Sequence, residues 1–173
     1  MVENTKKYNV GFVLGVFDLF HIGHINLIRR AKEHCNRLMV GVVADELPFE
    51  IKGVFPVIAF ENRFEIIKAV RGVDEVVKVD FSNVGRVRLW EQYKYDCFFC
   101  GDDYADKDAP LEDRRELRKK GSDLMFLPYT KGRTSTEIRN ALKQIQLQMP
   151  ASARNAAISE KTGREGGVRY EGT

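Results

Sequence analysis

The sequence predicts an α/β protein whose doubly wound, five-stranded parallel sheet carries helices on both faces. Apolar runs of strand length alternate with segments of helical periodicity along the chain, which is typical of parallel sheets. The loops richest in glycine and polar residues each follow a predicted strand, as ligand loops do in open parallel sheets. The 173 residues, 43% hydrophobic and 31% charged, suit one globular domain with a sizeable core.

Five apolar runs are predicted to form the strands of this Rossmann-like sheet. They are Tyr8–Leu14, Arg37–Ala44, Val73–Val79, Asp96–Cys100 and Asp123–Leu127. The predicted helices between and after them are His24–Cys35, Phe60–Arg71, Arg86–Tyr95, Leu111–Lys120 and Thr134–Leu147. The only tryptophan, Trp90, is expected to pack in the core. Leu47–Ala59 contains two prolines and a glycine, and is predicted to be a loop long enough to be functional.

Composition changes at Pro150, so we expect a domain over residues 1–149 and a flexible tail over residues 150–173. No apolar run reaches membrane-spanning length and the start of the chain has no apolar signal core, so no membrane insertion and a cytoplasmic location are expected. The net charge of +3 does not argue for nucleic acid. The charges of Leu111–Lys120 alternate in sign, as on a solvated helix face.

Three cysteines raise the question of redox or metal chemistry. Cys97 and Cys100 form a C-F-F-C pair, but they lie inside an apolar run, whereas a redox pair normally opens a helix. A structural zinc would need a second ligand pair, which the sequence lacks. We therefore expect packed strand thiols, and no metal bound directly by the protein.

The segment Gly15–His24, G-V-F-D-L-F-H-I-G-H, joins the first strand to the first helix. The first amides of a helix have no partner within it and lie at the positive end of its dipole, so this connection suits a phosphate. His21 and His24 add donors that can be cationic. Gly15 and Gly23 would let the backbone pass close to a ligand. Asp18 can cap the turn, order a histidine or face a metal ion.

The H-I-G-H segment resembles the signature of the HxGH nucleotidyltransferase superfamily, and the chain looks most like its bacterial glycerol-3-phosphate cytidylyltransferases. The resemblance implies catalytic roles for His21, His24 and Lys52, the one lysine in the loop where similar enzymes carry a lysine or a lysine pair. The class I aminoacyl-tRNA synthetases share H-x-G-H, but they are much larger and carry a lysine loop that this chain lacks.

Further segments extend the resemblance from about Val10 to Leu142. Gly101–Tyr104, G-D-D-Y, matches the G-D-D-[WY] of the glycerol-3-phosphate type. Tyr129–Thr136 resembles the R-T-x-G-x-S-T-[TS] signature, with Tyr129 in place of its first arginine and Arg133 available to supply that charge. The start of the last helix also fits a capping box between Thr134 and Glu137.

The resemblance implies two groups of binding residues. Those expected at the nucleotide are Gly15, Val16, Phe17, Gly23, Arg71, Gly101, Asp103, Tyr129, Thr130, Arg133, Thr134, Ser135 and Thr136. Those expected at the acceptor substrate are Asp18, Lys52, Arg63 and Asp102. Arg63 could instead pair with Glu61 or Glu65.

The leading hypothesis is a cytidylyltransferase that transfers CMP from CTP to a small phosphorylated alcohol, with glycerol 3-phosphate as first choice. It would release pyrophosphate and give a CDP-alcohol for cell-wall or capsule polymers. The resemblance implies Mg²⁺ with the triphosphate, and a homodimer. One alternative is an adenylyltransferase of the heptose-phosphate or flavin type, because Ser135–Leu142, S-T-E-I-R-N-A-L, resembles the flavin-type ending. Another is a non-catalytic nucleotide-binding module.

Overall fold

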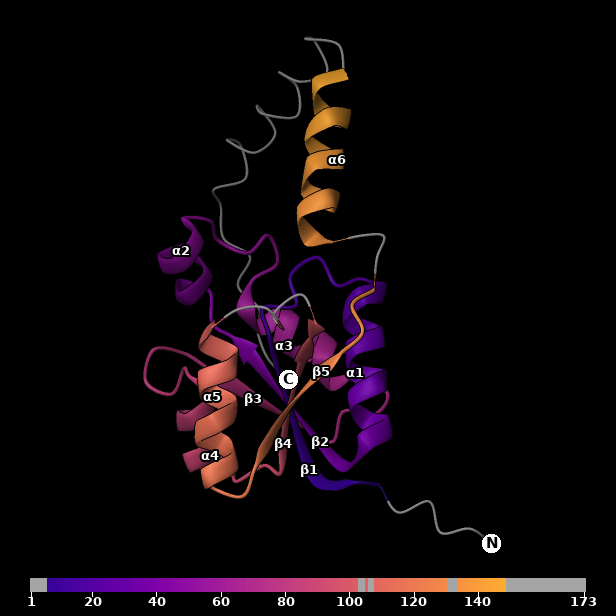
Figure 1. The fold of residues 1–173 in the computed structure, drawn as a ribbon. Coiled ribbons are helices and arrows are strands. Elements are labelled where there is room, and N and C mark those ends of the chain that lie inside the picture. The colour runs from indigo at the N-terminus through magenta and orange to yellow at the C-terminus, as the bar shows by residue number, and fades with distance from the viewer. Residues whose placement is uncertain (1–5, 103–104, 106–107, 131–133, 149–173) are drawn as a thin grey trace, which may run out of the picture. The chain divides into compact units, whose positions relative to one another are not determined.

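The computed structural model describes residues 6–102, 105, 108–130 and 134–148. Its centre is the expected five-stranded, fully parallel sheet, in the order β3-β2-β1-β4-β5 (Figure 1). The strands are β1 (Tyr8–Gly15), β2 (Cys35–Val43), β3 (Glu75–Val79), β4 (Cys97–Gly101) and β5 (Asp123–Leu127). The helices are α1 (Ile22–His34), α2 (Glu46–Lys52), α3 (Phe60–Lys68), α4 (Arg86–Tyr93), α5 (Asp108–Lys119) and α6 (Ser135–Gln148).

Strand order reverses between β1 and β4. The chain runs outward from β1 through β2 to β3, and then returns to the other side of β1 for β4 and β5. In doubly wound sheets the ligand crevice lies beyond the carboxyl ends of the strands at this switch point. The loop after β1 carries the H-I-G-H segment, and the residues after β4 carry Asp102, so the topology brings both to this edge.

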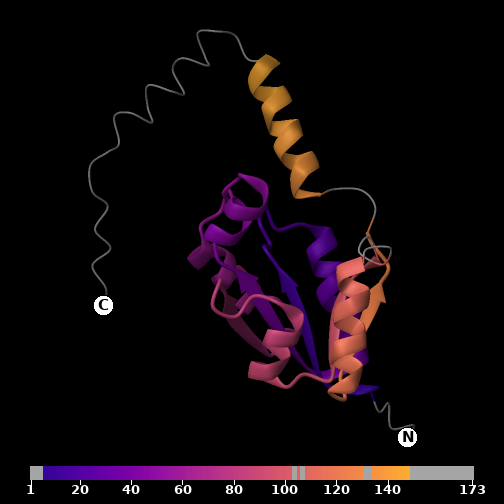
Figure 2. The ribbon, with the colours of Figure 1, turned by 60° about the vertical axis from the view of Figure 1, so that its left-hand side comes forward.

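Alternation along the strands divides the core into two clusters, one on each face of the sheet. Val13 packs with Ile28 of α1 and Ile67 of α3. Its neighbour Phe12 points the other way, into a cluster that includes Leu89 of α4 and Leu117 of α5. Helices therefore cover both faces, as predicted (Figure 1 and Figure 2). Trp90 is half-buried against the second cluster, as expected.

The segment between β2 and α3 differs from the sequence prediction. Leu47–Ala59 is predicted to be entirely loop, but residues 46–52 form the short helix α2. Pro48 is tolerated because it lies in the first helical turn, where the amides have no partner within the helix. Gly53 ends the helix in the left-handed conformation, φ 66°, and its N–H donates to the carbonyl of Phe49 at 2.7 Å.

All three cysteines are buried, as expected for packed thiols. Cys97 and Cys100 lie on β4, and burial raises the pKa of Cys97 to about 12. Such a thiol stays protonated at neutral pH, which makes it a poor nucleophile and a poor metal ligand.

The chain forms two compact units, residues 1–135 and residues 136–173. The sheet and helices α1 to α5 belong to the first unit, whereas α6 belongs to the second apart from Ser135. No residue of α6 is buried, and it exposes Leu142, Ile145 and Leu147. The tail predicted over residues 150–173 lies outside the described residues. Within the described part of the chain, no helix combines the length and the hydropathy needed to cross a membrane.

Candidate active site

The loop between β1 and α1 is held in an unusual backbone conformation. Phe17 and Leu19 have φ values of 55° and 48°, in the left-handed region that costs a residue with a side chain about 1–2 kcal/mol. The Phe17 ring is buried, and its edge meets the face of His24 with ring centroids 5.3 Å apart. Burial of this aromatic side chain offsets the backbone cost, and the loop delivers His21 to the start of α1.

His21 and His24 cap the helix reciprocally. The Nδ1 of His21 accepts from the N–H of Gly23 at 3.1 Å, and the Nδ1 of His24 accepts from the N–H of His21 at 3.3 Å. The two imidazoles stack with centroids 3.8 Å apart. Because each Nδ1 is an acceptor, the hydrogen of each neutral ring is carried by Nε2. Both rings thus act as Nε2–H donors.

His24 differs from the expectation that the histidines can be cationic. Burial, together with the neighbouring His21, lowers the pKa of His24 to about 3, although Asp18 acts in the opposite direction. The Phe20 ring covers His24 further, with centroids 5.4 Å apart. At neutral pH His24 is therefore a neutral hydrogen-bond donor, and the positive potential at this end of α1 comes from the helix dipole and its amides.

The two glycines of this segment leave space for side chains of the protein, and their expected closeness to a ligand stays a prediction. A Cβ at Gly23 would lie 2.8 Å from the His21 ring, and one at Gly15 would lie 2.8 Å from the Phe17 ring. Gly23 is therefore required by the imidazole that folds back over the first turn of α1. The H-x-G-H spacing reflects this packing, because any larger residue at Gly23 would displace His21.

Asp18 is 3% exposed and serves as an anchor for the segment after α2. Its two carboxylate oxygens accept from the N–H groups of Val57 and Ile58 at 3.0 and 2.9 Å. Its own carbonyl accepts from the hydroxyl of Ser135 at 2.7 Å. Asp18 therefore links the H-I-G-H loop to two segments that are distant in sequence. Its expected contact with the acceptor substrate stays a prediction.

Arg63 holds together the loops around the site, and its expected contact with the acceptor substrate stays a prediction. The side chain is completely buried, and its guanidinium donates to the carbonyl of Ile58 at 2.8 Å, to the carbonyl of Val16 and to the carboxylate of Asp45. Its ion-pair partner is Asp45 at the end of β2, rather than a glutamate on its own helix. The guanidinium therefore links the residue after β1, the segment before α3 and Asp45.

Lys52 is the last residue of α2 and is exposed. Among the described residues, none forms a hydrogen bond or an ion pair with its ammonium group, and Gly53 follows it in the left-handed conformation. The same segment exposes several apolar side chains, and the rings of Phe49 and Phe55 stack with centroids 4.2 Å apart. A catalytic role for Lys52 stays a prediction, and its ammonium group is available for a negatively charged ligand.

The segments after β4 and β5 meet at the same edge of the sheet. Gly101 ends β4 beside Leu127, the last residue of β5. The carboxylate of Asp102 accepts from the N–H of Tyr129 at 2.8 Å, and Tyr129 is 44% exposed. Asp103 and Arg133 lie outside the described residues. Thr134 lies just before α6, whereas Thr136 belongs to the second unit.

Two residues that the sequence analysis did not single out hold Thr130 in this region. Asn26 of α1 donates to the Thr130 hydroxyl at 3.1 Å. Arg30, one turn further along α1, donates to the Pro128 carbonyl and to the Thr130 hydroxyl, the latter at 3.5 Å. Their only signal in the sequence is their four-residue spacing on the helix that carries H-I-G-H, and this spacing does not reveal a partner about 100 residues away.

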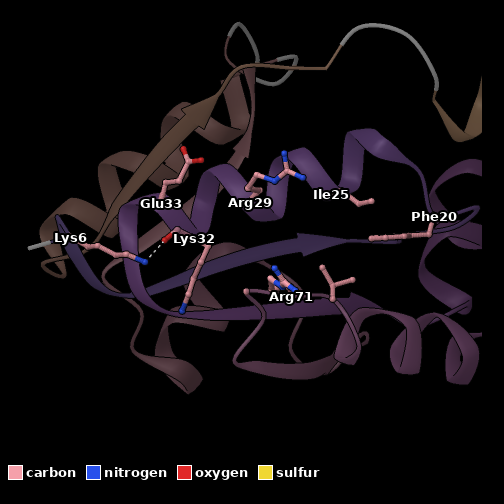
Figure 3. Close-up of a pocket in the computed structure, with 9 residues that line it drawn as sticks. Lys6, Phe20, Ile25, Arg29, Lys32, Glu33 and Arg71 are labelled. Carbon is pink, nitrogen blue, oxygen red and sulfur yellow. Dashed lines mark hydrogen bonds between the residues drawn. The ribbon is translucent and has the colours of Figure 1, made fainter. Parts of the chain in front are cut away.

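Arg71 lies in a groove of about 710 Å³ beside α1 (Figure 3). The other residues that line it are Lys6, Phe20, Ile25, Arg29, Lys32, Glu33, Val70 and Gly72. The ammonium group of Lys6 donates to the backbone carbonyl of Lys32 at 2.7 Å. The ammonium group of Lys32 donates to the carboxylate of Asp74 at 2.5 Å. Phe20 connects this groove to the histidines, because it also stacks on His24. The expected contact of Arg71 with a nucleotide stays a prediction.

Together these groups form a site suited to negatively charged ligands. The imidazoles of His21 and His24 lie with the first amides of α1 at one end, and an exposed lysine follows β2. Within the described part of the chain, no three histidine, cysteine or acidic side chains gather in a way that could hold a metal ion. Asp18 and Asp102 already accept backbone N–H groups. A divalent ion at this site would therefore be held chiefly by the oxygens of its ligand.

The structure has counterparts among solved structures. A lipopolysaccharide core biosynthesis protein from Thermoplasma volcanium superimposes with a TM-score of 0.59 at 22% identity, over 73% of this chain and 99% of the other. At this identity the likeness concerns the fold. It confirms the Rossmann-like class expected from the sequence.

The sequence relatives identify the family. A FAD synthase from Thermococcus sibiricus is 32% identical over 126 residues, which are 72% of this chain and 84% of that protein. A glycerol-3-phosphate cytidylyltransferase from Bacillus subtilis is 33% identical over 135 residues, 74% of this chain and 92% of the other. The bifunctional protein HldE from Granulibacter bethesdensis is 32% identical over 141 residues. The aligned region is 80% of this chain but only 28% of HldE.

The family model described as cytidylyltransferase-like matches residues 12–141, from β1 into α6. This range includes the H-I-G-H loop and the segments that follow every strand. The chain therefore belongs to the cytidylyltransferase-like family and is a nucleotidyltransferase.

Proposed function

We propose that this protein transfers CMP from CTP to a small phosphorylated alcohol, with glycerol 3-phosphate as the first choice. An oxygen of the acceptor's phosphate would attack the α-phosphorus of CTP. The bond from that phosphorus to the bridging oxygen would break, and pyrophosphate would leave with the bonding electrons. Enzymes of this kind contribute mainly positioning and charge stabilisation, because little covalent chemistry is required of the protein.

The observation that carries the proposal is the pair of Nε2–H donors at the start of α1. Their Nδ1 atoms are fixed on backbone N–H groups at 3.1 and 3.3 Å, so the orientation of the rings is set before a ligand binds. Preorganised donors aimed at developing charge are worth about 2.7–4 kcal/mol each in comparable sites. Lys52 would add a positive charge near the phosphates.

The magnesium ion belongs to the proposed substrate, the magnesium complex of CTP. Mg²⁺ commonly keeps several waters and binds through substrate phosphates with one or two carboxylates. The absence of a ready ligand cluster among the described residues is compatible with this mode. A homodimer and a cytoplasmic location are part of the same proposal, and sedimentation analysis would test the former.

A second candidate is adenylyl transfer to a flavin phosphate. It is supported by the similarity to the FAD synthase from Thermococcus sibiricus and by the S-T-E-I-R-N-A-L sequence of residues 135–142. Tyr129 also replaces the arginine of the cytidylyltransferase signature, next to the proposed nucleotide site. CTP transfer remains the first choice because G-D-D-Y matches the glycerol-3-phosphate type, and a relative of that type aligns over nearly its whole length.

Pyrophosphate release tests both candidates in one experiment. CTP and ATP, each with Mg²⁺, are crossed with glycerol 3-phosphate, phosphocholine, phosphoethanolamine, a heptose phosphate and FMN. The proposal expects release with CTP and a phosphorylated alcohol, and loss of release in His21→Ala and His24→Ala. Release with ATP and FMN would instead establish the flavin type. A nucleotide-dependent rise in melting temperature without pyrophosphate would indicate a non-catalytic binding module.

A further inference from the structure

Helix α1 holds the segment that follows β5. The Arg30 guanidinium donates to the Pro128 carbonyl and to the Thr130 hydroxyl, and Asn26 donates to the same hydroxyl at 3.1 Å. Among the described residues, no carboxylate forms an ion pair with Arg30. Its charge is therefore directed at this segment. We call these two side chains the α1 clasp.

The clasp and the histidines belong to one rigid element. Asn26 and Arg30 lie two and six residues after His24, one helical turn apart and on one side of α1. On its core side, Ile28 and Ala31 are completely buried against the sheet, so the helix cannot slide or rotate independently. A residue held by the clasp is therefore held at a fixed distance from the histidines.

The hydrogen bonds also determine what Thr130 can offer to a ligand. A hydroxyl has two acceptor sites and one donor hydrogen. In Thr130 the acceptor sites face Asn26 and, at a longer distance, Arg30. The hydroxyl hydrogen must then point away from α1. The N–H of the preceding residue, Tyr129, is already bound to Asp102, which fixes this segment from its other side.

We propose that Arg30 and Asn26 are positioning residues that orient the Thr130 hydroxyl as a donor to the nucleotide. This inference rests on the proposed function, because it assigns the nucleotide to the edge of the sheet where H-I-G-H and Thr130 meet. Neither clasp residue touches the nucleotide. Removing the clasp should therefore weaken nucleotide binding more than it slows the chemical step.

Four single variants test the clasp. Arg30→Met removes the donor but keeps an unbranched apolar side chain, and Arg30→Lys restores a cationic donor. Asn26→Leu removes the other donor at similar volume. Arg115→Met is the matched control, because Arg115 is exposed on α5 and forms no hydrogen bond or ion pair with any described residue.

Steady-state kinetics and hydrogen exchange are the two readouts. We expect Arg30→Met to raise the KM for the nucleotide about tenfold, which corresponds to losing one charge-assisted hydrogen bond, with kcat within about threefold of wild type. Arg30→Lys should recover most of the affinity. The amides of Tyr129 and Thr130 should exchange faster in Arg30→Met than in Arg115→Met, whereas the amides of β4 should not.

A double-mutant cycle with Thr130→Val isolates the contact. If the clasp acts through the Thr130 hydroxyl, Arg30→Met should raise KM much less in the Thr130→Val background than in wild type. Additive effects would overturn the proposal. An unchanged KM in Arg30→Met, or equal KM increases in Arg30→Met and Arg115→Met, would overturn it too.

Failure of the proposed function would look different. If wild-type protein released no pyrophosphate with any pair of substrates, nucleotide affinity would be measured directly by calorimetry on the same variants. Weaker binding and faster exchange at residues 129–130 in Arg30→Met would support the clasp even then. Wild-type affinity with wild-type exchange would refute the clasp, whatever reaction the protein catalyses.

Discussion

Lowering the pH from about 7.5 to about 5 should destabilise the folded protein through His24. The unfolded chain protonates this imidazole near its ordinary pKa of 6.5, whereas the folded chain does not until about pH 3. Below pH 6.5 the unfolded state therefore binds the extra proton, and acid favours unfolding. The stabilisation is complete above the unfolded pKa and is lost as the pH falls toward the folded value.

The size of this effect follows from the two pKa values. At about pH 5 the unfolded state gains about 1.5 pKa units of protonation free energy at His24, or about 2 kcal/mol. Groups other than His24 also titrate between these pH values, so a variant that lacks only the His24 imidazole is needed for comparison. The comparison variant is therefore His24→Asn, whose side-chain oxygen can still accept from the N–H of His21 but cannot titrate.

Urea denaturation at several pH values measures the free energy of unfolding for both proteins. Between about pH 7.5 and about pH 5, wild type should lose about 2 kcal/mol more than His24→Asn. Parallel pH dependences in the two proteins would refute the argument. So would an NMR titration in which the His24 ring protons shift with a midpoint near 6.5.

Three further predictions follow from the site geometry. Gly23→Ala should lower kcat about 100-fold, because the Cβ of alanine would displace the His21 ring. Pyrophosphate assays measure the loss of kcat, and an unchanged far-UV circular dichroism spectrum would show that the fold is intact. Lys52→Ala should lower kcat/KM at least tenfold without changing the melting temperature, since the side chain is exposed. Arg63→Met should lower the free energy of unfolding by about 3 kcal/mol, because it leaves Asp45 without its ion-pair partner; urea denaturation measures it, and a loss below about 1 kcal/mol would contradict it.

The architecture was predictable because its signals are local. Apolar runs such as Asp123–Leu127 became strands, and the alternation of strands and helices produced the parallel sheet. The exception is residues 46–52, where Pro48 suggested a loop. A proline is tolerated both in a loop and in the first turn of a helix, so Pro48 alone does not distinguish the two structures. The burial of Leu47 and Pro48 in the folded protein favoured the helix.

Site residues were harder to assign, because a side chain's role depends on its partners. In the sequence, Arg63 cannot be distinguished from an exposed arginine that binds a ligand. In the structure it is completely buried, and its guanidinium donates to two backbone carbonyls and to Asp45. Asn26 and Arg30 gave no signal, because their partners at residues 128–130 lie about 100 positions away in the chain. Sequence spacing cannot reveal such pairs.

The sequence by itself determined the sheet, its helical layers and the edge that carries the H-I-G-H loop, because hydrophobic periodicity and the H-x-G-H spacing are properties of neighbouring residues. Only the tertiary structure decided the state of the groups at that edge. The neutrality of His24, the burial of Arg63 and the clasp on Thr130 all depend on desolvation and on hydrogen bonds between distant segments. Those free energies exist only once the chain has folded.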